Sequence, residues 1–160
     1  MNRQILFKAK IKDNGKWVEG YYCKLDETTY CISEDYERHP VPTHHYILHE
    51  TMTDWGLPNR FLQFEIDPST ICQCTGLTDK NGKKIWENDI VTITIECDDY
   101  FNLSETGIVE YSYGQYELKV KTTDGKEAYS NLINKLSEAP FEIEKLGNIF
   151  DNPDLLEVER

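Results

Sequence analysis

Cysteine and histidine are the residues of this chain whose types and spacing could hold a metal ion. Cys72 and Cys74 lie two positions apart, so a strand would carry both thiols on one face, and Cys97 could join them. His45 and His49 lie four positions apart, which would place both imidazoles on one face of a helix. A tetrahedral zinc site requires four such ligands. These five residues are therefore the candidates for a metal centre.

The surrounding pattern argues against this chemistry. No C-x2-C pair is present, and the histidine-rich segment 39–50 lacks the glutamate that follows the first histidine in H-E-x-x-H. Cysteine commonly packs as a small apolar group. We therefore interpret the thiols as buried or incidental and the histidines as surface residues, and we predict neither a metal ion nor another cofactor.

Motifs of nucleophilic and phosphate chemistry are also missing. The sequence contains no G-x-S-x-G element and no phosphate-binding loop. Its 29 acidic residues are so many that a pair of carboxylates can be chosen anywhere, which means nothing without geometry. We predict that the protein is not an enzyme and assign no catalytic residue. The alternative hypothesis is that the protein is a zinc- or thiol-dependent enzyme.

The chain is strongly acidic. Its 17 basic and 29 acidic residues give a net charge of −12, of which residues 1–50, with 7 basic and 8 acidic groups, contribute only −1. A negative field repels nucleic-acid phosphates, whose neutralisation by Lys and Arg supplies much of ordinary duplex binding. We therefore expect no direct nucleic-acid binding. An acidic surface that imitates nucleic acid, and so inhibits a DNA-binding host protein, is a second functional hypothesis.

The cysteine count and the lack of long apolar runs indicate in which cellular compartment the protein is expected, the cytoplasm. Five cysteines, an odd number, occur without an apolar run long enough for a signal peptide or a membrane helix. We expect free thiols in the reducing cytoplasm and no membrane association.

Alternating hydrophobicity and turn residues predict a mainly β fold. In segment 90–97, Val91, Ile93 and Ile95 alternate with polar residues, and Asp13-Asn14-Gly15 is typical of a hairpin turn. Several short strands between tight turns in residues 70–127 favour a small, strongly bent barrel. Strands are predicted at 5–11, 17–25, 28–33, 61–66, 70–77, 90–97, 106–113 and 116–123, with a polar loop over 97–105.

Two regions depart from this pattern. Residues 34–60 contain three prolines and no clear period, so we predict an irregular excursion with at most one short helix. Near the C-terminus, helical spacing behind Ser130 predicts a short helix over 129–138, followed by an extended segment over 141–150 and a terminal helix from Asn152. We expect an N-terminal β lobe over 1–68 and a barrel with a helical C-terminal return over 69–160.

Two blocks of the sequence resemble the signature blocks of the YopX family. They are EIDPSTICQCTGLTDKNGKKIWENDIV (65–91) and LGNIFDNPDLLE (146–157), and the opening FKAKIKDNGKWVEGYY is similar to the start of that family. Cys74 stands where an aromatic residue is usual, and Trp86 replaces a tyrosine or phenylalanine. Asn88 stands in place of a glycine, which is a mild change because Asn tolerates the left-handed region. The matching motif residues are Thr75, Gly76, Leu77, Asp79, Asn81, Gly82, Trp86, Asp89, Gly147, Asn148, Asn152 and Pro153.

The resemblance implies a fold and an origin but supplies no activity. It implies an SH3-like barrel and a protein of phage or prophage origin. We interpret segment 75–91 as a fold signature, with a binding loop as the alternative. The leading functional hypothesis is a non-enzymatic protein-interaction module that acts on a host or phage protein, and homo-oligomerisation is an open expectation.

Overall fold

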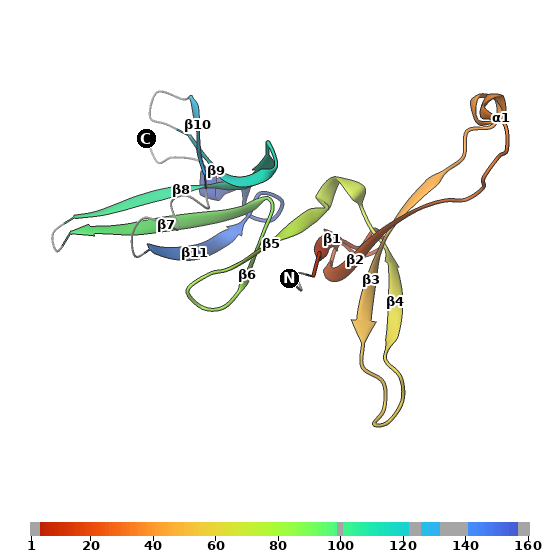
Figure 1. Cartoon of the computed structure of the whole chain (residues 1–160), viewed down its shortest axis with the longest axis horizontal. Coiled ribbons are helices and arrows are strands. Elements are labelled where there is room, and N and C mark those ends of the chain that lie inside the picture. The colour runs from red at the N-terminus through yellow and green to blue at the C-terminus, as the bar shows by residue number, and fades with distance from the viewer. Residues whose placement is uncertain (1–3, 99–100, 122–125, 132–140, 157–160) are drawn as a thin grey trace. The chain divides into compact units, whose positions relative to one another are not determined.

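The computed structural model describes residues 4–98, 101–121, 126–131 and 141–156. The protein is mainly β, with antiparallel sheets and a small barrel-like C-terminal part, which confirms the predicted fold class. The chain forms two compact units, residues 1–73 and 74–160 (Figure 1). The predicted division falls after residue 68 and the observed one after Gln73.

The first unit is a twisted antiparallel sheet with a long hairpin. Strands β1 to β4 pair in the order β4-β3-β2-β1, and the first residues of β5 pair with β1. The 3-10 turn η1 begins behind Asp67, whose side chain accepts the Ser69 main-chain N–H. The bounds are β1 Phe7–Lys10, β2 Trp17–Asp26, α1 Ser33–Arg38, β3 Thr43–Thr51, β4 Arg60–Glu65, η1 Pro68–Thr70 and β5 Cys72–Thr78.

Strand alternation buries one face of this sheet. Ala9, Val18, Ile47 and Ile66 form its core and are almost inaccessible to solvent. Strands β2 and β3 approach each other closely at Gly20, where a Cβ atom would collide with the carbonyl oxygen of Leu48. The contact between these two strands therefore requires a residue without a side chain.

The second unit is built on a five-stranded antiparallel sheet with the order β10-β9-β8-β7-β11, and the end of β5 pairs with β6. Its core consists of Ile85, Val91, Ile93, Val109, Tyr116, Leu118 and Ile143. The bounds are β6 Lys84–Trp86, β7 Asp89–Asp98, β8 Phe101–Ser112, β9 Gln115–Lys121, β10 Glu127–Asn131, β11 Phe141–Asn148 and η2 Pro153–Leu156.

The predicted polar loop over 97–105 is wrong, because β7 and β8 extend through most of it. Hydroxyl side chains of the two strands bond across the ladder. The hydroxyl oxygens of Thr92 and Thr106 are 2.7 Å apart, and those of Thr94 and Ser104 are 3.4 Å apart. Cross-strand hydroxyl pairs stabilise this part of the sheet, which the alternation of apolar and polar residues did not predict.

The prediction of an irregular excursion over 34–60 is wrong where residues 43–51 and Arg60 lie in strands. Residues 33–38 form the predicted short helix, α1, but 43–51 form β3, which pairs with both β2 and β4. Two long-range partners thus stabilise a segment whose local pattern is ambiguous. By contrast, the strand predicted at 28–33 is absent.

The C-terminal helices differ from the prediction. The first residues of the helix predicted at 129–138, with Ser130, lie in strand β10, and 132–140 fall outside the described residues. The extended segment is confirmed as β11. The terminal helix is the single 3-10 turn η2, which begins at Pro153 directly after Asn152.

Candidate functional site

Asp79 holds the turn at the centre of the family motif. Its side chain is buried, and Oδ1 accepts the main-chain N–H groups of Asn81 and Lys83, each at 2.8 Å. Burial opposes ionisation of this carboxyl, but the bonds from Lys83 and Asn81 outweigh it and hold the pKa of Asp79 below its usual value. Gly82 completes the turn with a φ of 78°.

Asp89 holds the next bend. It is fully buried, and its Oδ2 accepts the main-chain N–H of Trp86 at 2.8 Å and lies 2.7 Å from Nζ of Lys145. The Trp86 ring beside it is also buried. Asn88 between them has a φ of 65°, the left-handed conformation for which Asn is suited in place of Gly.

The remaining motif residues also make structural contacts. Thr75 donates its hydroxyl to the carbonyl of Ile85 at 2.8 Å and accepts the N–H of Leu77, and Gly76 beside it has a φ of 83°. Asn148 accepts the N–H groups of Phe150 and Asp151, both at 3.0 Å, and so shapes the bend before η2. A Cβ at Gly147 would collide with the side chain of Asn152. Each contact observed here orders a bend or a strand end.

The cysteines do not converge on a metal site in the described part of the chain. Cys72 is buried, with its thiol 3.4 Å from the carbonyl of Thr70, while Cys74 is half-buried in the other compact unit. Cys97 lies in β7, but its side chain is not among those described. No group of three or more His, Cys, Asp or Glu residues suited to a metal occurs among the described residues.

His45 and His49 lie on strand β3, so the idea that they share a helical face is wrong. They still share a face of the sheet, because strand residues of equal parity do. Nδ1 of His45 is 2.7 Å from the hydroxyl of Tyr22, and Nδ1 of His49 is 2.7 Å from the carbonyl of Glu19. Each ring has its own separate partner.

His44 joins an ion-pair network that the sequence did not reveal. Its Nε2 lies 2.8 Å from Glu27, and its Nδ1 lies 3.2 Å from Glu65, which also bonds Lys12 at 2.7 Å. Two ring nitrogens that both face carboxylates must both carry protons. The bond to Glu27, followed by that to Glu65, accordingly raises the pKa of His44 above its usual value. The residues of this network are far apart in sequence, so their spacing could not have indicated the network.

A hollow of about 440 Å³ lies beside this network in the first unit. Its charged groups are already engaged: Lys12 bonds Glu65, Asp67 accepts the N–H and hydroxyl of Ser69, and the Lys10 ammonium lies over the Trp17 ring. His45 also lines it and is bonded to Tyr22. These contacts stabilise the sheet corner and leave the hollow with no set of groups converging on a ligand.

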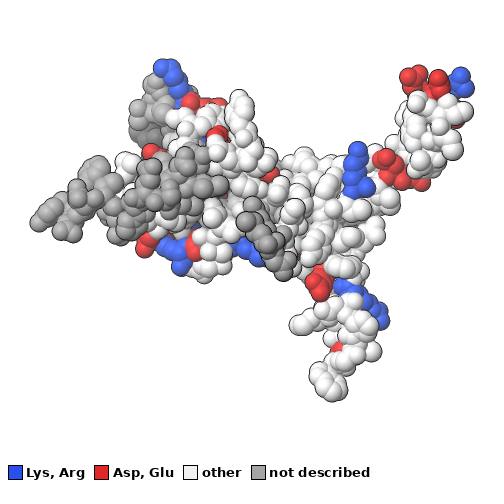
Figure 2. Space-filling view, viewed as in Figure 1, with Lys and Arg blue, Asp and Glu red and all other residues white. Residues whose placement is uncertain are grey.

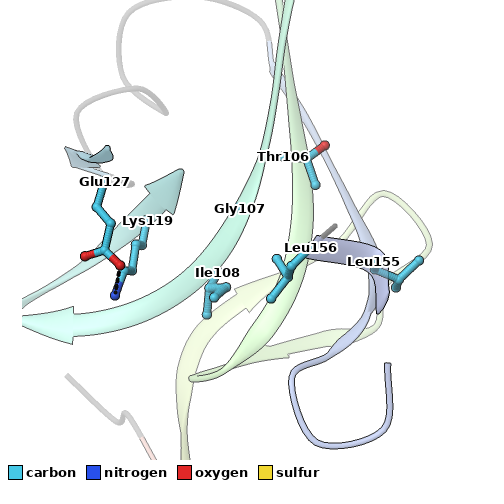
Figure 3. Close-up of a pocket in the computed structure, with 7 residues that line it drawn as sticks. All are labelled: Thr106, Gly107, Ile108, Lys119, Glu127, Leu155 and Leu156. Carbon is cyan, nitrogen blue, oxygen red and sulfur yellow. Dashed lines mark ion pairs between the residues drawn. The ribbon is translucent and has the colours of Figure 1, made fainter. Parts of the chain in front are cut away.

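A second cavity, of about 200 Å³, lies in the C-terminal unit (Figure 3). Ile108, Leu155 and Leu156 give it an apolar wall, and the Lys119–Glu127 pair, with a separation of 3.1 Å, is its ionisable part. The bond to Glu127 raises the pKa of Lys119, so this amine is held as an ammonium and is unsuited to act as a base or nucleophile. The cavity could accept a small apolar group.

The most exposed apolar group of the first unit is the loop between β3 and β4, residues 52–59, here called the β3–β4 loop. Trp55 is fully exposed at 101%, Met52 is 85% exposed, and Leu57 is 56% exposed. The hairpin projects from its sheet in Figure 1, and its end is almost free of charged atoms in Figure 2. Soluble proteins rarely expose large apolar side chains together without a partner.

Hydrogen bonds at three points give the β3–β4 loop a defined shape. The N–H of Leu57 donates to the carbonyl of Asp54 at 3.0 Å, and Gly56 between them has a φ of 80°. Thr53 donates its hydroxyl to Pro58, and Asn59 donates its amide to Glu50. Trp55 is therefore presented on an ordered turn. Sequence reasoning missed this residue, although the run T-D-W-G-L-P sets a tryptophan among turn formers.

Comparisons with known proteins match the chain to a family and show a solved structure that is similar to it. The family model described as YopX protein matches residues 6–157. The crystal structure of protein EF1440 from Enterococcus faecalis is similar with a TM-score of 0.48 and 17% sequence identity, over 98% of this chain and 100% of that one. No curated protein matches. Within the described residues, no helix combines the length and apolar character needed to cross a membrane.

Proposed function

Since the chain belongs to the YopX family, we propose that it is a non-enzymatic protein-interaction module of a phage or prophage, with Trp55 as its anchor. It acts in the bacterial cytoplasm on a host or phage protein. The observation that carries the proposal is the complete exposure of Trp55 on an ordered turn.

The chemistry of the β3–β4 loop supports a protein as the partner. Tryptophan is enriched among the few residues that supply most of the binding energy of protein interfaces, where it fills a desolvated pocket. Met52 and Leu57 add exposed apolar surface beside it, and Asp54 is the sole charged residue of the loop. A partner with an apolar pocket that admits an indole would fit this surface.

The hydrogen bonds of the loop favour binding energetically. Ordering a flexible loop on association costs free energy for each side chain that is immobilised. Here Thr53, Leu57 and Asn59 already bond within the hairpin. Less of the binding energy is therefore lost to ordering than in an unstructured segment.

The proposal is tested with Trp55→Ala and a matched control, Tyr113→Ala. Tyr113 is 98% exposed and also lies at a hairpin turn, between β8 and β9, so the control removes an equally exposed aromatic side chain. Full-length variants are used to recover partners from host lysate, and the affinity for a recovered protein is then measured. We expect Trp55→Ala to weaken binding by about 30-fold, the loss typical of an anchor residue.

Unchanged melting temperatures of both variants would show that the loss is not caused by unfolding. Retention of the same partner by Trp55→Ala, at wild-type affinity, would contradict the proposal.

A further inference from the structure

Strand β4, Arg60–Glu65, lies at the edge of its sheet in the first unit. In the described part of the chain it pairs with β3 alone, and its register with β3 is regular throughout. Proteins commonly protect such edges with lysine, proline or a bulge. The sequence RFLQFE contains no lysine or proline, its charged residues stand only at its two ends, and four of its six residues are exposed.

The hydrogen-bond pattern shows which main-chain groups point outward from this edge. The N–H of Ile66 donates to the carbonyl of His45 at 2.9 Å, so Ile66 and every second residue before it direct their groups toward β3. Phe61, Gln63 and Glu65 consequently direct theirs away from β3. The carbonyl of Glu65 accepts the N–H of Lys12 at 3.0 Å, which agrees with this assignment and leaves Phe61 and Gln63 as the outward pair.

We propose that β4 pairs antiparallel with β4 of a second copy of the chain, about a two-fold axis at Leu62. In this register Phe61 lies opposite Gln63 of the second copy, and the reverse pair follows from the symmetry. Each pair exchanges two N–H to carbonyl bonds, so the outward groups of Phe61 and Gln63 in both strands are all satisfied. The two sheets then form one continuous sheet.

Neighbouring registers satisfy fewer groups. A two-fold axis at Gln63 would place Phe61 opposite Glu65, whose carbonyl already accepts the Lys12 N–H. An axis at Phe61 would place Gln63 opposite Asn59, which lies outside the strand. The register centred on Leu62 is the one that uses both outward residues of each strand.

The side chains of β4 suit a second copy. Leu62 is 47% exposed and would meet its own symmetry mate, on the same face of the strand as the partly buried core residue Phe64. Phe61, 58% exposed, lies on the other face against the ring of Tyr21 at 6.0 Å and would extend that aromatic surface. Arg60 would lie opposite Phe64 of the second copy, where a cation–π contact is possible.

The charge of the strand allows the same occupant. Two chains of net charge −12 repel each other, so association is favoured where the local charge is lowest. Strand β4 carries one basic and one acidic residue, Arg60 and Glu65, and is neutral. No like charges face each other in the proposed register.

The first test is the mass of the full-length protein in solution over a range of concentrations. We expect a dimer, at twice the chain mass of 18.7 kDa. Leu62→Lys places two ammonium groups together at the axis and should convert the dimer to a monomer. Leu25→Lys is the matched control, because Leu25 is a similarly exposed leucine, at 56%, in strand β2. It should leave the dimer intact.

The second test fixes the register by cross-linking. Directly opposite residues of a pair without hydrogen bonds have Cα atoms about 4.5 Å apart, within the range of a disulfide. Leu62→Cys should therefore form a dimer disulfide on mild oxidation. Phe61→Cys is the control, because Phe61 and its symmetry mate are diagonal neighbours, at about 7–8 Å. The unmodified chain, with its own cysteines, gives the background.

A monomeric wild-type protein, a dimer that survives Leu62→Lys, or equal cross-linking by the two cysteine variants would each overturn the proposal. The first of these results would leave the β4 edge to a strand of another protein. The inference is independent of the proposed function, since Trp55→Ala leaves β4 unchanged and Leu62→Lys leaves the β3–β4 loop unchanged. A protein that dimerises but has no partner at Trp55 would support the dimer and contradict the proposed function. A monomer that binds a partner through Trp55 would do the opposite.

Discussion

At the scale of single residues, the family motif consists largely of side chains that satisfy main-chain groups at bends. Asp79, Asp89 and Asn148 are buried polar residues, and each accepts main-chain N–H groups close to it in sequence. Burying a polar group is costly unless it is bonded, so such residues specify one local conformation strongly. The contacts explain why a segment rich in charge can serve the fold.

The strongest prediction at this scale concerns Asp89. Asp89→Ala removes the acceptor of the Trp86 N–H and leaves Lys145 without this buried carboxylate. Breaking a buried ion pair from one side typically costs about 3–5 kcal/mol. We expect a loss of that size in the free energy of unfolding, measured by denaturant titration.

Asp89→Asn is the control for that experiment, because the amide oxygen can still accept the Trp86 N–H. It should lose less stability than the alanine variant. A wild-type unfolding curve for Asp89→Ala would contradict the structural role assigned to this residue.

The role of a residue could be predicted from the sequence where that role depends only on its local backbone conformation. The interpretation of Asn88 as a tolerated substitute for glycine is confirmed by its φ of 65°. Trp55 could not be predicted as exposed, since whether an aromatic residue packs depends on what folds over it, and that is not a local property.

At the scale of elements, the strands with a clear period of two were predicted and those stabilised by distant partners were not. Segment 90–97 alternates cleanly and is confirmed within β7. Strand β3 carries three of the four histidines, and its strand conformation depends on pairing with β2 and β4. The His44 network at one end of this strand likewise joins residues 12, 27, 44 and 65.

This network predicts a pH dependence of the sheet corner. The raised pKa of His44 means that its contribution to stability is complete below the unfolded value of about 6.5 and is lost as pH rises through the folded value. Lys12, followed by His44, lowers the pKa of Glu65, so its contribution is lost as pH falls through that lower value. We expect the corner to be most stable between these two limits.

The measurement is an NMR titration of the His44 imidazole in the folded protein. Glu27→Gln removes the partner with the largest effect and should lower the pKa of His44. Glu34→Gln, which changes an exposed carboxylate in helix α1, should leave it unchanged. A His44 pKa that does not respond to Glu27→Gln would show that the contact is absent in solution.

At the scale of the whole molecule, the negative charge is divided unequally between the two compact units. Residues 1–73 carry 8 basic and 11 acidic groups, and residues 74–160 carry 9 and 18, so the net charges are −3 and −9. A field of this sign weakens any contact with phosphate, most of all at low salt, where screening is least.

We therefore predict that the full-length protein does not retard duplex DNA in a gel-shift assay at low ionic strength. Binding that weakens steeply as salt is added would indicate phosphate contacts and would overturn the charge argument. A second protein of similar net charge and size serves as the control for non-specific retention.

The solvent exposure of Trp55 also has an optical consequence. The chain has three tryptophans: Trp86 is buried, Trp17 is half-buried with lysine ammonium groups over its ring, and Trp55 is surrounded by water. An indole in water emits at longer wavelength than a buried one, and iodide quenches it readily. The long-wavelength, quenchable fraction of the emission thus belongs mainly to Trp55. The protein carries its own fluorescent reporter, without a label, at the position where contact with a partner would shield the indole.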